Sequence, residues 1–271
     1  DASLAYSLYN RLFISVKDKL LDLNHLIIIP SGPLASLPFS LLIEEDPKDE
    51  GYEKVSWMVN RMAFSYSPSL KTFYSQRTAA KNSKPTKKLF ALANPLLTGE
   101  KVQRKDAEKG LTALATSCRQ AGPASSDLIR SLAPLPDTES EVNNVKNSLG
   151  KTEKSEIQIF TRKDANEKNL RNLQLDDYRV LYFATHGLLP GELKCQAEPG
   201  LVLTPPKKAN SRDNDGLLEA SEIASLKLNA DLVVLSACNT AGSGGKFGGD
   251  ALSGLAEAFF YAGAKSLVVS H

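Results

Sequence analysis

Short apolar segments alternate with helical segments over residues 88–270, and this alternation constrains the fold more than any other feature of the sequence. The segments that we expect to form strands are residues 88–93, 157–160, 178–185, 201–204, 231–237 and 265–270. Helices are expected at residues 138–150, after residue 164, at 217–226 and at 250–261. Thr138 and Glu141 have the spacing of a capping box for the first of these helices, and Asp164 can cap the second. Strands that alternate with helices are typical of a mostly parallel sheet flanked by helices. The sequence therefore predicts an α/β fold.

The first 80 residues are organised differently. Leucine and valine recur at near-helical spacing from Leu4 to Leu20 and predict an amphipathic helix over residues 4–21. A β-branched run at residues 26–30 ends at Pro30-Ser-Gly-Pro33 and predicts a strand and a turn. The composition then turns polar, so we expect an N-terminal α/β portion at residues 1–80 and a larger core at residues 81–271. Because the last predicted strand ends at residue 270, we expect the core to continue beyond His271.

The composition is that of a soluble globular protein, with 42% hydrophobic residues, 24% charged residues and a net charge of +2. It gives no indication of a nucleic-acid or membrane partner. The three cysteines have no regular spacing, so we expect a reducing, cytoplasmic setting rather than a disulfide framework. The cysteines and histidines are not spaced like metal ligands, so we expect neither a metal nor a cofactor.

One histidine and one cysteine follow apolar segments of the predicted sheet. His186 follows Val180-Leu-Tyr-Phe-Ala-Thr185, and Cys238 follows Leu232-Val-Val-Leu-Ser-Ala237. The carboxyl ends of parallel strands lie along one edge of a sheet, so neighbouring strands would place both side chains in one crevice. An imidazole beside a thiol promotes formation of the nucleophilic thiolate. The N–H groups of Gly187 and Cys238 are candidates for an oxyanion hole.

The residues alone leave a second interpretation open. A cysteine after an apolar strand is often a small buried side chain, and a histidine there is often only hydrogen-bonded. Spacing therefore suggests a catalytic pair without establishing one.

The segments around both residues resemble a known family. Thr185-His-Gly187 and Leu235-Ser-Ala-Cys-Asn-Thr240 are similar to the two signature blocks of the CHAT domain, which belongs to the caspase, separase and clostripain group of cysteine proteases. Other blocks agree in the same order, namely Ile29-Pro-Ser-Gly-Pro-Leu34, Ala93-Asn-Pro95, Leu135-Pro-Asp-Thr-Glu-Ser-Glu141, Asp215-Gly-Leu-Leu-Glu-Ala-Ser-Glu-Ile223 and Gly254-Leu-Ala-Glu-Ala-Phe-Phe-Tyr-Ala-Gly-Ala264.

The resemblance implies a caspase-like fold and a cysteine endopeptidase that cleaves a protein or peptide substrate. Cys238 would be the nucleophile, His186 the general base and acid, and Gly187 an oxyanion donor. Members of the family often carry upstream tetratricopeptide repeats, and they continue with further elements, so the C-terminal part of the fold is expected to be missing here. Regulation by segments outside this chain is also expected.

The sequence leaves the substrate specificity open. In related peptidases the residue two positions before the cysteine lines the pocket for the substrate side chain, and here it is Ser236, which has no charge. Thr185, beside the histidine, is a further candidate for substrate binding. Asp215, Glu219 and Asp250 could supply charge, although a turn aspartate, a solvated helix residue and a helix N-cap are simpler interpretations of them.

The sequence raises two alternative functions. The first is a catalytically silent caspase-like scaffold or interaction module. The second is a nucleotide-binding domain that would use the glycine-rich stretch from Gly242 to Asp250. That stretch lacks the spacing of a phosphate loop, because Thr240 and Phe247 occupy the positions of a required glycine and a required serine or threonine. We interpret it instead as a loop beside the cleft whose ordering could gate activity.

Overall fold

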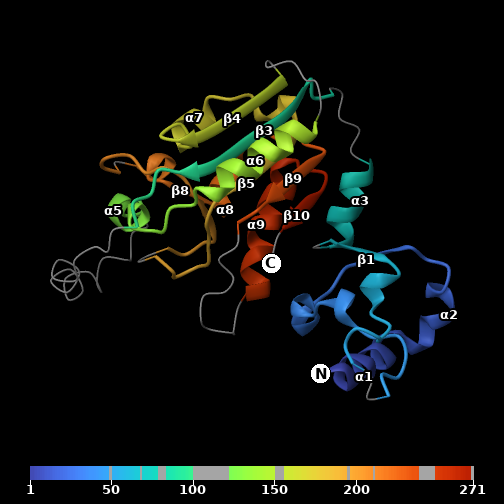
Figure 1. Cartoon of the computed structure of the whole chain (residues 1–271). Coiled ribbons are helices and arrows are strands. Elements are labelled where there is room, and N and C mark those ends of the chain that lie inside the picture. Colours follow the sequence, from blue (N-terminus) through green and yellow to red (C-terminus); the bar gives the residue numbers. More distant parts are fainter. Residues whose placement is uncertain are drawn as a thin grey trace, which may run out of the picture. The chain divides into compact units, whose positions relative to one another are not determined.

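The structure, a computed structural model, describes residues 1–48, 51–67, 69–78, 84–99, 122–149, 156–193, 196–209, 211–237 and 248–269 (Figure 1). The chain divides into two compact units, residues 1–79 and residues 80–271, which are described separately.

The first unit combines short helices with a two-stranded parallel sheet. The sheet consists of β1 (His25–Ile28) and β2 (Ala63–Tyr66). The helical elements are α1 (Ala2–Phe13), η1 (Ile14–Val16), α2 (Lys17–Leu20), η2 (Gly32–Ser36), η3 (Phe39–Leu41), η4 (Met58–Asn60) and α3 (Leu70–Thr78). The helix predicted over residues 4–21 is therefore broken by a tighter turn at η1. A small core of Tyr9, Phe39, Leu42, Met58 and Met62 holds the unit together.

The second unit is built on a five-stranded, all-parallel sheet in the order β10-β9-β5-β3-β4. Its strands are β3 (Lys87–Pro95), β4 (Ile157–Arg162), β5 (Tyr178–Ala184), β9 (Leu232–Leu235) and β10 (Leu267–Val269). The parallel α/β sheet predicted from the sequence is therefore confirmed. Strand β5 occupies the centre, in agreement with its apolar composition.

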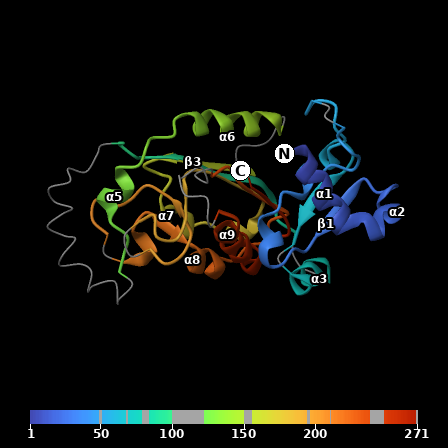
Figure 2. The same ribbon diagram turned by 90° about the horizontal axis from the view of Figure 1, so that it is seen from below.

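Helices cover both faces of this sheet (Figure 2). Helix α6 (Asp137–Ser148) lies on one face, and α7 (Glu167–Arg171), α8 (Ala220–Ser225) and α9 (Gly248–Ala262) lie on the other. Alternate residues of β3 point in opposite directions, so Leu89 packs in one cluster with Val142 of α6, while Phe90 belongs to the larger cluster that contains Phe259 of α9.

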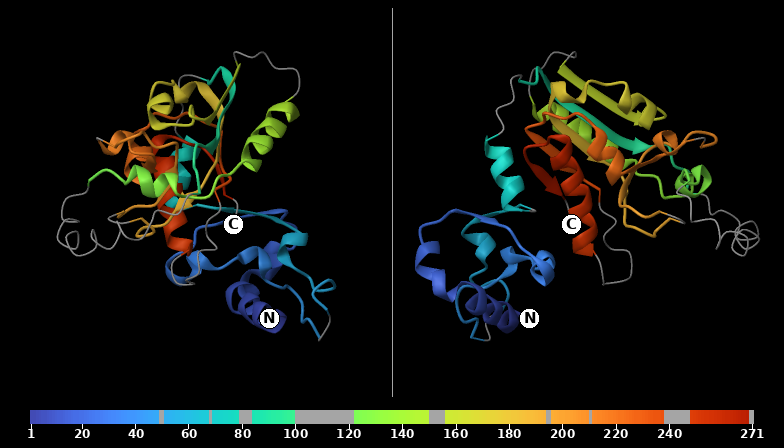
Figure 3. Two further views of the ribbon diagram at one scale, coloured as in Figure 1. Left: turned by 60° about the vertical axis from the view of Figure 1, so that its left-hand side comes forward. Right: turned by 180° about the vertical axis from the view of Figure 1, so that it is seen from behind.

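A second, smaller sheet joins β6 (Gly187–Leu188), β7 (Gly200–Val202) and β8 (Leu217–Glu219) in antiparallel pairs. The sequence predicted a turn and a helix over residues 217–226, whereas residues 217–219 form a strand and the helix begins at Ala220. The short helix α5 (Ser126–Arg130) lies beyond the carboxyl end of β3 (Figure 3).

Two predicted helix caps are wrong. Thr138 and Glu141 were expected to form a capping box, but α6 has Pro136 at its N-cap and no side-chain cap. The Thr138 hydroxyl donates to Leu135 O and accepts from Asn94 N, which leaves Glu141 for a different contact. Helix α7 is capped by Asn166 and not by Asp164. In α6 a tertiary contact with β3 occupies the Thr138 hydroxyl, whereas in α7 the local cap forms two residues later than Asp164, with Asn166 accepting from Asn169 N.

Candidate active site

Strands β5 and β9 are neighbours, as the interpretation of His186 and Cys238 requires. Phe183 lies opposite Leu235, and Ser236 N donates to Phe183 O at 2.9 Å. The segments that follow the two strands therefore leave the sheet side by side at its carboxyl edge. Cys238 lies outside the described residues, and the description of β9 and its continuation ends at Ala237.

Gly187 lies against the residue that precedes the cysteine. A Cβ atom built on Gly187 would lie 3.1 Å from Ala237 O and 3.6 Å from Ala237 Cβ. The first distance is shorter than ordinary van der Waals contact, so the absence of a side chain allows the two backbones to approach. The residue after the histidine therefore contacts the residue before the cysteine.

Strand β7 holds the backbone around the histidine. Val202 N donates to His186 O at 2.9 Å, and the Thr185 hydroxyl donates to Val202 O at 2.5 Å. In this register Gly187 and Leu201 form a non-hydrogen-bonded pair, so the Gly187 N–H is not used in pairing with β7. The pairing with β7 therefore leaves that N–H as a candidate for the oxyanion donor that the sequence suggests.

The His186 ring is oriented by a backbone carbonyl that the sequence did not reveal. Its Nε2 atom lies 2.8 Å from Ala133 O, in the segment that leads into α6. Because a carbonyl oxygen only accepts, Nε2 carries the proton and Nδ1 is the basic nitrogen of the neutral ring. A base oriented by a third group is the arrangement of a catalytic histidine. No sequence pattern marks a backbone carbonyl about 50 residues away as that partner.

The other candidate residues have different surroundings. Thr185 is buried and bonded to β7, and Glu219 is paired with Arg212. Asp215 is buried, and its carboxylate accepts from Ala124 N at 2.6 Å and from Leu217 N at 2.9 Å. These are the contacts of structural residues. Ser236 lies at the carboxyl edge, whereas the side chain of Asp250, in the first turn of α9, is outside the described part of the structure.

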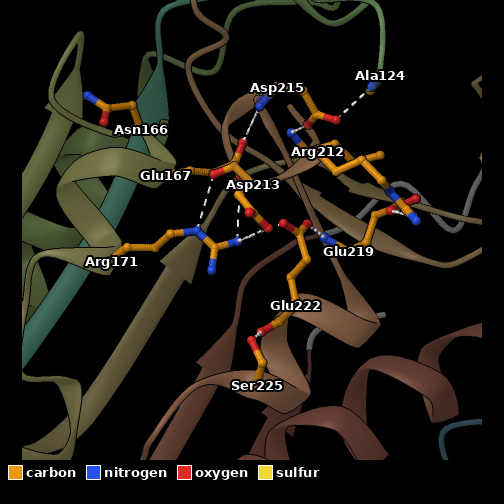
Figure 4. A network of polar contacts seen from close by, with 12 residues as sticks. Ala124, Asn166, Glu167, Arg171, Arg212, Asp213, Asp215, Glu219, Glu222 and Ser225 are labelled. Carbon is orange, nitrogen blue, oxygen red and sulfur yellow. Dashed lines mark hydrogen bonds and ion pairs between the residues drawn. The ribbon is translucent and has the colours of Figure 1, made fainter. Parts of the chain in front are cut away.

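Asp215 belongs to a buried network of carboxylates on the side of the unit that supports the small sheet (Figure 4). Glu167 accepts from Asp215 N at 2.9 Å and from Gly216 N at 2.6 Å, and Arg171 pairs with Glu222 at 2.7 Å. Burial is the main cause that raises the pKa of Glu167 to about 8 and that of Glu222 to about 7. The network ties together α7, α8 and the loop before β8.

The segment around α5 connects this network to the residue that orients His186. Asp215 holds Ala124 just before α5, and Thr98 N donates to Arg130 O at the end of that helix. Ala133, whose carbonyl orients His186, lies three residues beyond this point. The segment that carries Ala133 is therefore anchored by polar contacts before α5 and at its end.

Among the described residues, no group of three or more His, Cys, Asp or Glu side chains is arranged to hold a metal ion. Within the same part of the chain, no helix is both long and apolar enough to cross a membrane. Cys195 and residues 242–247 of the glycine-rich stretch lie outside the described residues.

The fold and this edge define a class of protein: an α/β protein with a five-stranded parallel sheet and a histidine placed beside the strand that leads to a cysteine. The family model of the CHAT domain matches residues 3–271, so the chain belongs to the CHAT domain family, a caspase-like peptidase family. This match confirms the resemblance carried by the motifs. Comparison with curated proteins gives no matching relative.

Proposed function

We propose that this chain is a caspase-like cysteine endopeptidase that cleaves a protein partner with His186 and Cys238. The contact between Gly187 and Ala237 is the observation that carries the proposal. It brings the residue after the histidine to the residue before the cysteine, across two neighbouring strands. The orientation of the His186 ring by Ala133 O supports the same assignment.

In the proposed reaction, the Cys238 thiol gives its proton to His186 Nδ1, and the thiolate attacks the scissile carbonyl carbon. The N–H groups of Gly187 and Cys238 donate to the resulting oxyanion. His186 then protonates the leaving amine as the C–N bond breaks, which leaves a thioester on Cys238. A water molecule, deprotonated by His186, hydrolyses the thioester and restores the thiol. The Ala133 carbonyl stabilises the imidazolium by accepting a hydrogen bond from its Nε2–H group.

The substrate in this proposal is a protein or an exposed peptide segment in the cytoplasm. Control would come from segments outside the chain, such as tetratricopeptide repeats, and from the glycine-rich stretch that follows Cys238 in the sequence. The repeats are proposed because of the family assignment, and the glycine-rich stretch because of its position after Cys238 in the sequence.

The test compares the wild-type chain with Cys238→Ala and His186→Ala on a library of proteome-derived peptides. We expect both variants to lose cleavage, and we expect Cys118→Ala, the matched control, to retain it. A peptide with a thiol-directed warhead should label Cys238 in the wild type and in the control. Cleavage that persists in Cys238→Ala would refute the assignment. Complete absence of cleavage and labelling would favour the catalytically silent scaffold.

A further inference from the structure

Three polar side chains meet on the α6 side of the large sheet, near the candidate active site. The Tyr182 hydroxyl, from β5, donates to Glu141 Oε1 of α6 at 2.6 Å. Ser236, which follows β9, lies beside the same phenol and counteracts the effect of Glu141 on its pKa. We call these residues the Glu141–Tyr182–Ser236 group.

The phenol of this group stays neutral. Burial, followed by the hydrogen bond and the charge of Glu141, raises the pKa of Tyr182 to about 12. Tyr182 therefore keeps its proton at physiological pH and donates a hydrogen bond to the carboxylate. This hydrogen bond holds Glu141 in place, but it does not neutralise the negative charge.

Glu141 is half-buried and has no ion pair among the residues that the structure describes. Two other partly buried acidic side chains of this unit, Glu222 and Glu219, are paired with Arg171 and Arg212. A partly desolvated carboxylate interacts strongly with a guanidinium or ammonium group that can also hydrogen-bond to it. Glu141 is therefore suited to a basic group that arrives from outside the described structure.

The position of the group relates it to peptide cleavage. Ser236 lies at the carboxyl edge of the sheet and precedes Cys238 by two residues in the sequence. The His186 ring contacts Ala133 O in the segment that leads into α6, and Glu141 is carried by that same helix. A substrate carbonyl at Cys238 would thus place the neighbouring side chain within reach of the group.

We propose that Glu141, held by Tyr182, selects an arginine or lysine side chain beside the scissile bond of the substrate. This inference rests on the proposed peptidase function and adds a substrate class to it. Ser236 itself has no charge. The negative charge near it comes from the Glu141 carboxylate on α6. Glu141 is a specificity residue in this proposal, and Tyr182 is a positioning residue.

The first experiment measures kcat/KM on peptides that differ only in the residue before the scissile bond, with Arg, Lys, Gln, Ala or Glu there. We expect the wild type to prefer Arg and Lys over Gln by at least about tenfold, as for a charge-assisted hydrogen bond. Glu141→Gln should remove this preference while keeping activity on Gln and Ala peptides. Tyr182→Phe should reduce it. Glu139→Gln, a carboxylate of the same helix that bonds Asn94, is the matched control and should retain it.

The second experiment measures benzamidine binding by calorimetry in the Cys238→Ala background, so that its readout does not depend on turnover. We expect the dissociation constant to rise at least about tenfold on adding Glu141→Gln and to be unchanged on adding Glu139→Gln. Thermal melting checks that the variants are folded.

The outcomes separate this inference from the proposed function. Peptide cleavage with an Arg-to-Gln preference that is the same in Glu141→Gln and the wild type would overturn the inference and leave the peptidase standing. Benzamidine binding that does not depend on Glu141 would also overturn it. Conversely, Glu141-dependent binding without cleavage of any peptide would count against the peptidase and support Glu141 as a binding site for a basic group.

Discussion

Replacing Gly187 by alanine tests the contact on which the proposed active site depends. The new Cβ would lie 3.1 Å from Ala237 O, which is 0.3 Å inside the 3.4 Å at which ordinary contact begins. Gly187 does not have a positive φ, so the substitution introduces no backbone strain of that kind. One of the two backbones must therefore move by a few tenths of an ångström, and either movement changes the relation of His186 to the cysteine segment.

The expected losses of stability and activity differ in size. Overpacking by one methyl group costs about 1–3 kcal/mol, and the lower entropy of the unfolded chain returns about 0.4–1 kcal/mol. The net loss of at most about 2.5 kcal/mol corresponds to a fall in Tm of about 5–10 °C. Peptidase activity should fall further, by about 100-fold in kcat/KM, because misplacement of catalytic groups or loss of an oxyanion donor has an effect of that size.

The assay pairs thermal melting with kcat/KM on the best peptide from the library, at a temperature well below the melting transition. Gly51→Ala is the matched control, because a Cβ there meets nothing within 4 Å and Gly51 belongs to the first unit. It should change neither quantity. A Gly187→Ala variant with wild-type kcat/KM would refute the argument that this close approach sets the catalytic geometry.

Two further predictions concern the surroundings of the site. The folded chain holds the Glu167 pKa at about 8, above the ordinary 4.5, so this carboxyl favours the folded state at low pH and loses that contribution as the pH rises from about 4.5 to 8. Glu167→Gln should make the fall of Tm over this range shallower, and a slope equal to that of the wild type would contradict the assignment. Thr185→Val removes the hydrogen bond to Val202 O and leaves a buried acceptor, so urea unfolding should show a loss of about 1–3 kcal/mol. A loss below about 0.5 kcal/mol would show that β7 does not depend on this bond.

The buried carboxylates explain why Asp215 and Glu219 were poor guides to specificity. Both lie in a motif that resembles the family, and charge near a sheet edge is a reasonable sign of substrate binding. Yet Asp215 accepts two backbone N–H groups, and Glu219 pairs with Arg212. Burial and hydrogen-bond partners decide whether an acidic residue meets the substrate or holds a loop, and neither property is visible in a linear pattern.

Much of the site depends on contacts between residues that are distant in sequence. Ala133 O, which orients His186, is a backbone atom, and a backbone atom has no residue-type signature. The spacing of Thr138 and Glu141 is that of a capping box, so the sequence predicts a helix cap at this position. The fold instead bonds Thr138 to Asn94 of β3 and turns Glu141 toward Tyr182 of β5.

The sequence by itself determined the class of fold, the family and the two residues proposed for chemistry. Apolar strands that alternate with helices favour a parallel sheet, because both faces must be buried, and the blocks around His186 and Cys238 identified the CHAT domain. Only the tertiary structure decided that β5 and β9 are neighbours, that Gly187 contacts Ala237 and that Glu141 lies beside Tyr182. The physical reason is that local patterns report periodicity and burial, whereas strand order and side-chain partners follow from how the whole chain packs.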